Sequence, residues 1–174
     1  MLEIYHGDGK GKTTAAAGLA LRAAGNGAKV IFVQFLKDGS SGELRLLEKE
    51  DNICVMHADT FYGFTKNMTA EQKNGQKESY TRLLDNVFGR YNELCRESFC
   101  VLVFDEILHA IKADLVDENA FSDRIRDIKG DCELVLTGRE PSQKLLEMAD
   151  YVTYFKKEKH PYDKGIAARK YIEF

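Results

Sequence analysis

The most regular feature of the chain is an alternation between short apolar segments and longer segments with helical periodicity. Several of the short segments are continuously apolar, which is typical of strands that helices cover on both faces. Strands that alternate with helices indicate βαβ units around a parallel sheet. The predicted strands are Leu2–Tyr5, Lys29–Phe35, Ile53–His57, Cys100–Phe104, Glu133–Thr137 and Tyr151–Phe155. We therefore expect an α/β fold with about six mostly parallel strands.

Local signals define three of the predicted helices. The segment Thr13–Ala24 is rich in alanine, a strong helix former, and glycines at positions 25 and 27 suit a helix end with positive φ. Asp117 can cap a second helix, which ends before Gly130. Pro141 stands where a first-turn proline is tolerated, so we expect it to open a helix that runs through Met148.

The longest helix is predicted from about Ala70 to Arg96. Thr69 directly precedes this helix and Gln72 lies in its first turn, which is the spacing of a capping box. Gly75 and Gly89 lie within this segment and are positions at which the helix can bend or break.

The chain reads as one domain over residues 1–174. Its 174 residues suffice for one hydrophobic core, and it contains no internal repeat, low-complexity segment or linker. Three segments lack a clear period: Leu36–Gly42, Asp59–Met68 and Lys156–Gly165. Loops at strand ends usually form the ligand site of an α/β fold, so we expect these segments to surround it.

Composition and charge narrow the class of partner. The chain is 44% hydrophobic and 30% charged, and its formal net charge of −3 gives no general attraction to nucleic acid or to an anionic membrane. Its first residues lack a basic segment followed by an apolar one, and no apolar run approaches the ~18 residues that span a bilayer. We expect a cytoplasmic protein without a nucleic-acid or membrane partner.

The four cysteines, Cys54, Cys95, Cys100 and Cys132, form no C-x-x-C pair. Three of them lie in or beside apolar runs typical of buried strands or helices. We therefore expect free, mostly structural thiols in a reducing compartment.

A glycine-rich loop between the first strand and the first helix is the clearest functional signal. Glycines at 7, 9 and 11 allow backbone N–H groups to approach phosphate oxygens, and the helix N-terminus adds partial positive charge. Lys12 is expected on the phosphates and the Thr13 hydroxyl on Mg²⁺ (or Mn²⁺). The predicted ATP-binding loop comprises Gly7, Asp8, Gly9, Lys10, Gly11, Lys12, Thr13 and Thr14.

This loop departs from the usual G-x-x-x-x-G-K-[ST] pattern in one place. The pattern requires a glycine at position 6, where this chain has His6, and Gly7 comes one position late. A glycine-rich turn without a ligand is the alternative. The strand and the helix that the motif requires both flank the loop, which favours a phosphate site and a three-layer P-loop NTPase-like (RecA-like) domain.

Asp105 and Glu106 follow a continuously apolar strand, which is the Walker B arrangement. In a parallel sheet this strand end would lie near the phosphate loop, where Asp105 or Glu106 could bind Mg²⁺ directly or through water. Alternatively, the two acids only cap the next helix. Glu106 and His109 also have an i, i+3 spacing that suits a metal, but without a third ligand a structural or surface histidine is favoured.

Several segments together resemble the P-loop type of ATP:corrinoid adenosyltransferase, also called cob(I)alamin or cob(I)yrinic acid a,c-diamide adenosyltransferase. A glycine-lysine loop that begins one position late is itself a feature of that family. The matching segments span nearly the whole chain in order, and they are residues 7–27, 33–37, 63–65, 105–107, 137–139, 149–152 and 159–169.

The resemblance implies a reaction in which Co(I) of a reduced corrinoid attacks the 5′-carbon of ATP and inorganic triphosphate leaves. Such a reaction needs no side-chain nucleophile or general base, because the corrinoid brings its own electron pair. The protein must orient the reactants and stabilise the charge of the departing triphosphate. We expect Lys12 and Glu106 to act in catalysis, with Thr13, Glu106 and Asp105 as metal ligands.

The resemblance adds further candidates. Arg22 is either a solvated helix residue or, as its match implies, part of the nucleotide site. Arg139 follows a strand end, from which it can reach phosphate. Phe64 matches an aromatic residue thought to face the corrinoid, whereas Lys66 stands where a tryptophan is common. Phe61 and Tyr62 fit either a small satellite of the core or a wall of the corrinoid site.

The C-terminal stretch of the chain raises similar alternatives. Residues 156–170 are rich in lysine, which suits either a solvated surface or, by the resemblance, a segment near the corrinoid or a subunit contact. Tyr154 and Lys156 replace a glutamate and an arginine common there. The chain begins at its first strand, without the N-terminal extension of some family members, so lid closure is expected to differ. The resemblance further implies a homodimer and allows a flavoprotein reductant.

Two other functions remain open from the residues alone. A P-loop kinase, such as a nucleoside kinase, would use Glu106 to assist a substrate hydroxyl and would produce ADP. The chain has neither the C-x-x-C zinc module nor a recognisable lid that would favour it. An ATP-dependent switch would instead bind a partner through the aromatic loop.

Overall fold

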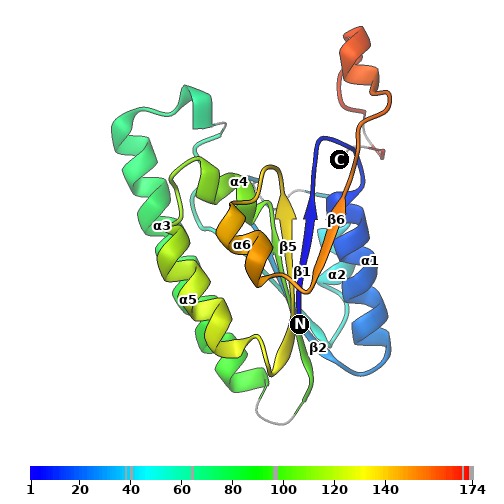
Figure 1. Cartoon of the computed structure of the whole chain (residues 1–174), viewed down its shortest axis with the longest axis vertical. Helices are drawn as coiled ribbons and strands as arrows, with labels where there is room; N and C mark the ends of the chain where they lie inside the picture. The colour runs from blue at the N-terminus through cyan, green and yellow to red at the C-terminus, as the bar shows by residue number, and fades with distance from the viewer. Residues whose placement is uncertain (38, 40, 64, 96–97, 170, 173–174) are drawn as a thin grey trace.

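The structure of the protein is a computed structural model that describes all residues except 38, 40, 64, 96–97, 170 and 173–174. Among the described residues, six strands form one sheet in the order β3-β2-β4-β5-β1-β6, and all neighbouring strands are parallel (Figure 1). The α/β prediction of about six mostly parallel strands is confirmed. The strands are β1 (Leu2–His6), β2 (Lys29–Gln34), β3 (Ile53–His57), β4 (Cys100–Asp105), β5 (Cys132–Gly138) and β6 (Tyr151–Tyr154).

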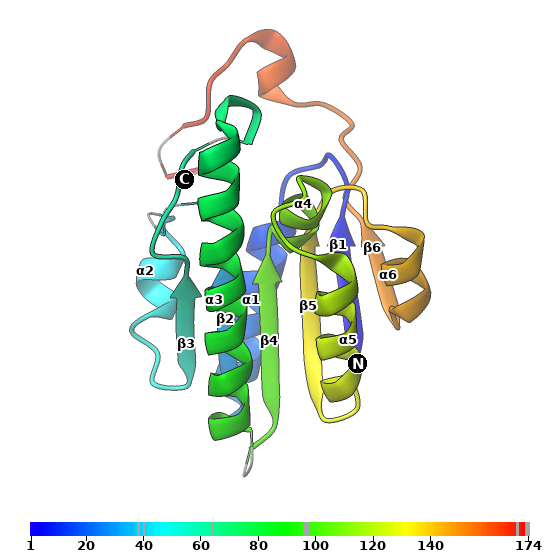
Figure 2. The same ribbon diagram turned by 90° about the vertical axis from the view of Figure 1, so that its left-hand side faces the viewer.

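Helices cover both faces of the sheet and make the three layers of the fold (Figure 2). Helices α1 and α2 pack on one face, and α3, α4, α5 and α6 pack on the other. Two 3₁₀ turns, η1 (Thr65–Asn67) and η2 (Pro161–Lys164), lie in segments predicted to be irregular. The helices are α1 (Lys12–Gly25), α2 (Leu44–Leu47), α3 (Ala70–Leu94), α4 (Ile107–Lys112), α5 (Glu118–Ile128) and α6 (Gln143–Met148).

Strand β2 shows why the central strands are apolar almost throughout. Ile31 and Val33 belong to the core beneath α3, α4 and α5, whereas Val30 and Phe32 belong to the core beneath α1 and α2. All four side chains are fully buried. Successive residues of a strand point to opposite faces, so a strand with helices on both sides must be apolar at every position.

The helix ends follow the predicted caps, with one exception. The Thr69 hydroxyl accepts from Gln72 N at 3.2 Å and Gln72 Oε1 accepts from Thr69 N at 2.9 Å, so the capping box is confirmed. Gly75 and Gly89 lie inside an uninterrupted helix. Asp117 caps α5 by accepting from Ala120 N at 2.7 Å.

The exception is α6, which Pro141 does not open. Ser142 is its N-cap, and the helix begins at Gln143. The Ser142 hydroxyl accepts from Leu145 N at 3.2 Å, which satisfies one of the unpaired N–H groups of the first turn. A serine directly after the proline competes for the cap position, so Pro141 stands one residue before the cap.

The prediction of four free thiols is wrong for one pair. Cys95 and Cys100 form a disulfide with a Cα–Cα distance of 5.6 Å, while Cys54 and Cys132 are free. Helix α3 ends and β4 begins within a few residues of each other, which brings the two cysteines together. No helix in the described part of the chain is long and apolar enough to cross a membrane.

Candidate functional site

The glycine-rich loop follows β1 and packs against the chain that leaves β6. Gly9 N donates to Phe155 O at 2.7 Å. A Cβ at Gly9 would lie 2.7 Å from Phe155 O and 2.8 Å from Lys156 O, and a Cβ at Gly7 would lie 2.5 Å from Phe155 O. Gly7 also has a φ of 118°. Glycine is required at both positions because a side chain has no room, and at Gly7 also because of the backbone conformation.

Lys12 opens α1 and folds back into the loop. Its side chain is 8% exposed, and its ammonium donates to Gly7 O at 2.7 Å and to Gly9 O at 2.8 Å. Burial lowers the pKa of this ammonium below its usual value, whereas the negative charges of Glu106 and Asp8 act in the opposite direction. Both of these acceptors are uncharged carbonyl groups, so the positive charge of the ammonium is available to an anion.

Asp105, at the end of β4, connects the loop to the centre of the sheet. Strand β5 separates β4 from β1, yet Thr13 Oγ1 donates to Asp105 Oδ1 at 2.8 Å. Thr137 Oγ1, from β5, donates to the same oxygen at 2.7 Å. Asp105 is fully buried. The predicted approach of the acidic strand end to the phosphate loop is thus present as a direct hydrogen bond.

Glu106 follows in a left-handed conformation, with a φ of 64°. Its backbone N–H donates to Thr137 Oγ1 at 2.9 Å, and its carboxylate is hydrogen-bonded to His109 Nδ1. Burial raises the pKa of the Glu106 carboxyl, but the hydrogen bond with His109 and the charges of His109, Lys37 and Lys12 together bring that pKa below its usual value. The i, i+3 spacing of Glu106 and His109 thus places the imidazole in direct contact with the carboxylate.

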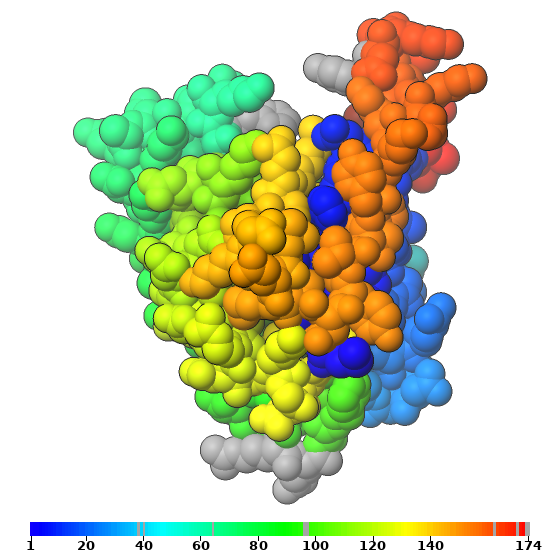
Figure 3. All heavy atoms as spheres, viewed as in Figure 1, coloured from blue at the N-terminus to red at the C-terminus, as the bar shows by residue number. Residues whose placement is uncertain are grey.

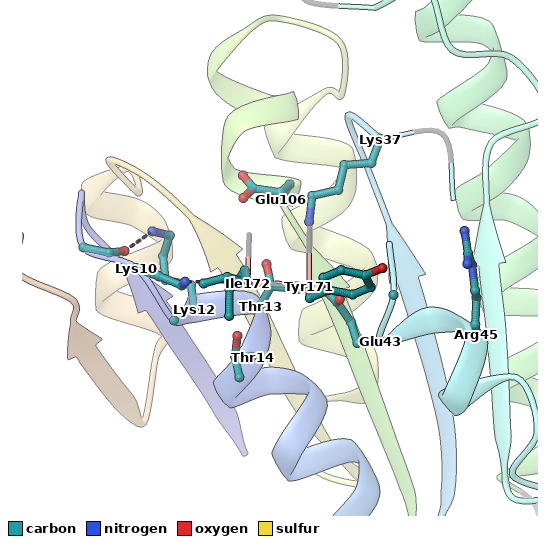
Figure 4. A pocket seen from close by; sticks show the side chains of 13 residues that line it. Lys10, Lys12, Thr13, Thr14, Lys37, Glu43, Arg45, Glu106, Tyr171 and Ile172 are labelled. Atoms are coloured by element: carbon teal, nitrogen blue, oxygen red, sulfur yellow. Dashed lines mark hydrogen bonds between the residues drawn. The ribbon is translucent and has the colours of Figure 1, made fainter. Parts of the chain in front are cut away.

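Lys12, Thr13 and Glu106 line a pocket of about 430 Å³ at the carboxyl edge of the sheet (Figure 4). Lys37 and Glu106 reach into it from the side of β2 and β4, and Lys10, Lys12 and Thr13 come from the loop and α1. Its lining residues are Gly9, Lys10, Gly11, Lys12, Thr13, Thr14, Lys37, Gly42, Glu43, Arg45, Glu106, Tyr171 and Ile172.

The C-terminal segment contributes the last two lining residues. After β6 the chain passes over the carboxyl edge of the sheet (Figure 2) and stands out from the body of the molecule (Figure 3). Ile172 O then accepts from Lys10 Nζ at 3.0 Å. This lysine-rich segment thus ends beside the phosphate loop, a contact that its sequence did not reveal.

The remaining predicted residues are placed as follows. Arg139 follows β5, and its Nη1 lies 3.5 Å from Asp8 Oδ1 at the loop. Arg22 is exposed in the last turn of α1, outside the described lining of the pocket. Phe64 lies outside the described residues. Residues before it are held to α3, because Gln76 Nε2 donates to Thr60 O at 3.0 Å and Gln76 Oε1 accepts from Tyr62 N at 3.2 Å.

Three residues of the site had no predicted role: Gln34, Lys37 and Thr137. All three lie at or just after the carboxyl ends of strands and contact Asp105. Polar residues at the ends of buried strands were the available signal, and both Gln34 and Thr137 fit it.

The site suits Mg²⁺, although no group of three or more His, Cys, Asp or Glu that could hold a metal occurs among the described residues. Mg²⁺ usually takes only one or two protein ligands and completes its shell with water and substrate phosphates. The Thr13 hydroxyl and the buried Asp105 carboxylate, 2.8 Å apart, are oxygen groups of the kind that Mg²⁺ takes, and Glu106 offers a second carboxylate at the pocket.

Comparisons with known proteins identify the family of the chain. The family model described as "ATP:corrinoid adenosyltransferase BtuR/CobO/CobP" matches residues 1–174. A corrinoid adenosyltransferase of Sinorhizobium sp. is 31% identical over 100% of this chain and 80% of its own length. Those of Escherichia coli K12 and Salmonella typhimurium are 31% and 29% identical, each over 98% of this chain and 84% of the relative. The chain belongs to the ATP:corrinoid adenosyltransferase family.

Proposed function

We propose that this chain transfers the 5′-deoxyadenosyl group of ATP to Co(I) of a reduced corrinoid, in the synthesis or salvage of adenosylcobalamin. The observation that carries the proposal is the contact between Thr13 and Asp105, which joins a phosphate loop to a buried carboxylate in a chain that matches this family over its whole length. Relatives of similar length bear the same activity in their names.

In this reaction the electron pair of Co(I) forms the cobalt–carbon bond at C5′. The bond between C5′ and its oxygen breaks, and that oxygen leaves with the triphosphate. Negative charge therefore grows on the triphosphate as the reaction proceeds, and stabilising it lowers the barrier. The Lys12 ammonium is suited to this because its hydrogen bonds to Gly7 O and Gly9 O hold it at the loop before the substrate arrives.

The ATP site of this proposal comprises the loop residues Gly7–Thr14, with Arg139 and Arg22 as further phosphate or nucleotide contacts. Arg139 is supported by its position beside Asp8, whereas Arg22 rests on the resemblance alone. Thr13, Asp105 and Glu106 would hold Mg²⁺, or Mn²⁺ in its place, which would neutralise phosphate charge. On the corrinoid side we propose Phe64, which rests on the resemblance alone.

The phosphorus-containing product tests the function. The protein is incubated with ATP and a chemically reduced corrinoid, and the products are resolved by phosphorus NMR. Inorganic triphosphate formed in step with adenosylated corrinoid supports the proposal. ADP with a phosphorylated acceptor would support a kinase, and unchanged ATP would support a non-catalytic switch. The Lys12→Ala variant serves as the control for contaminating activity.

The oligomeric state, the cellular location and the electron donor are also proposals. We propose a homodimer, which the exposed Tyr151, Val152 and Tyr154 side chains on edge strand β6 support, and analytical ultracentrifugation would test it. A monomer at micromolar concentration would contradict it. We further propose a cytoplasmic location, where ATP is available, and a flavoprotein as the source of electrons for cobalt.

A further inference from the structure

Asp105 carries a buried charge whose neutralisation depends on Lys37. Both hydroxyl donors to Asp105, from Thr13 and Thr137, act on Oδ1. The other oxygen, Oδ2, accepts from Lys37 Nζ at 3.2 Å and from Gln34 Nε2 at 3.4 Å. Asp105 is fully buried, whereas the Lys37 side chain is 33% exposed. A buried carboxylate is costly without a cation, so this ion pair matters more than an ordinary surface pair.

The backbone after β2 directs Lys37 back toward Asp105. Phe35 N donates to Asp105 O at 3.0 Å, and Leu36 N donates to the buried Tyr80 hydroxyl at 2.8 Å. Leu36 adopts a φ of 55°, which turns the chain sharply. A left-handed conformation is unfavourable for a leucine and persists only where neighbouring contacts enforce it. Lys37 is therefore held at the pocket by a fixed turn.

Gln34 provides a second observation at the same carboxylate. It pairs with Asp105 in the register of β2 and β4, and its side chain is 1% exposed. Its Oε1 atom is buried and has no hydrogen-bond partner among the described residues. A buried acceptor without a donor in the chain is usually satisfied by an ordered water molecule or a bound group. A water molecule carried by a hydrated cation at Oδ2 would supply that donor.

We propose that Lys37 changes partner during the reaction. In the ligand-free protein its ammonium fills the cation position at Asp105, and a divalent metal that arrives with ATP displaces it. Lys37 lines the same pocket as the phosphate loop (Figure 4), so the displaced ammonium can move to the triphosphate, on the side opposite Lys12. The leaving group then receives positive charge from two sides. This inference rests on the proposed metal site at Thr13 and Asp105.

The displacement predicts that removing Lys37 strengthens metal binding. A competitor that occupies the site in about nine tenths of the molecules weakens the apparent affinity of another ligand about tenfold. We therefore expect Lys37→Met to bind Mn²⁺ alone about tenfold more tightly than the unchanged protein, measured by loss of the EPR signal of free Mn²⁺. Lys37→Arg keeps a positive charge beside Asp105, so it should bind Mn²⁺ as weakly as the unchanged protein does. Lys49→Met, at an exposed position outside the pocket, should have no effect.

The second half of the proposal predicts a change of opposite sign. With Mn²⁺ saturating, Lys37→Met should bind inorganic triphosphate about tenfold more weakly by calorimetry, because one charge-assisted contact to phosphate is lost, and Lys37→Arg should bind it nearly normally. If Lys37 had only a structural role, its removal would not strengthen metal binding and weaken triphosphate binding at the same time.

The variant Asp105→Asn separates failure of this inference from failure of the proposed metal site. If Asp105→Asn loses Mn²⁺ while Lys37→Met binds it no more tightly than the unchanged protein, the role of Lys37 is refuted and the metal site stands. If Asp105→Asn binds Mn²⁺ normally, or neither parent nor Lys37→Met binds it, both the metal site and the inference are refuted. Unchanged triphosphate affinity in Lys37→Met would refute the change of partner.

Discussion

Replacing Thr137 with valine tests whether the buried network around Asp105 holds the site together. The substitution keeps the branched shape of the side chain and removes only its hydroxyl. In the structure that hydroxyl donates to Asp105 Oδ1 at 2.7 Å and accepts from Glu106 N at 2.9 Å. Thr137 and Asp105 are both fully buried, so water cannot readily replace either bond.

The magnitude follows from these two bonds. A hydrogen bond to a charged group contributes about 1.5–3 kcal/mol and a neutral one about 0.5–1.5 kcal/mol. Their sum predicts that Thr137→Val lowers the free energy of unfolding by about 3 kcal/mol. For a chain of this length, that corresponds to a fall in Tm of about 6–12 °C.

Urea unfolding followed by circular dichroism would measure this loss. Thr137→Ser keeps the hydroxyl, so its free energy of unfolding should fall much less. Thr153→Val makes the same chemical change on the exposed strand β6 and should stay within about 0.5 kcal/mol of the parent. A loss below about 1 kcal/mol for Thr137→Val would refute the network, because it would mean that neither bond matters to stability.

Three further changes have defined outcomes. Lys12→Ala should lower turnover at least about a hundredfold and leave the circular dichroism spectrum unchanged, because the Lys12 ammonium stabilises the phosphates and not the fold. Triphosphate release at the normal rate would exclude a role of Lys12 in catalysis. Thiol titration of the unfolded, unreduced protein should find two thiols, and four would contradict the disulfide. Reducing the disulfide should lower the free energy of unfolding by about 2 kcal/mol. The Leu2 N–H and the Lys129 ammonium lower the pKa of Asp150 below its usual value of 3.8. The Asp150 carboxylate therefore stabilises the folded protein above that pH, and this stabilisation is lost as the pH falls through the lowered pKa of the folded state. The urea midpoints of Asp150→Asn and the parent should therefore converge in acid, and a constant difference would contradict the shift.

Much of the fold could be predicted because its signals are local. Strands such as β4 are apolar throughout because both faces are covered, and each predicted strand lies within about two residues of its observed ends. The capping box at Thr69 and the cap at Asp117 depend only on residues three positions apart. The short helix α2 was missed because a single turn leaves no detectable period.

The parts of the site that escaped prediction depend on contacts across the sheet. Gln34 and Thr137 meet Asp105 only because β2 and β5 are its neighbours, an order that the sequence does not specify. Lys37 reaches the same carboxylate because of the turn at Leu36. The phosphate loop, by contrast, is contiguous in sequence, and for this reason it was recognised despite the displaced glycine at position 7.

The most direct test of the central claim follows the 5′-oxygen of ATP. ATP labelled with oxygen-18 at the position between C5′ and the α-phosphorus is incubated with the protein and reduced corrinoid, and the phosphorus products are analysed by mass spectrometry. Attack of cobalt on carbon predicts that the label leaves in inorganic triphosphate. Label that stays with the nucleoside would mean that phosphorus was attacked, and it would contradict the account.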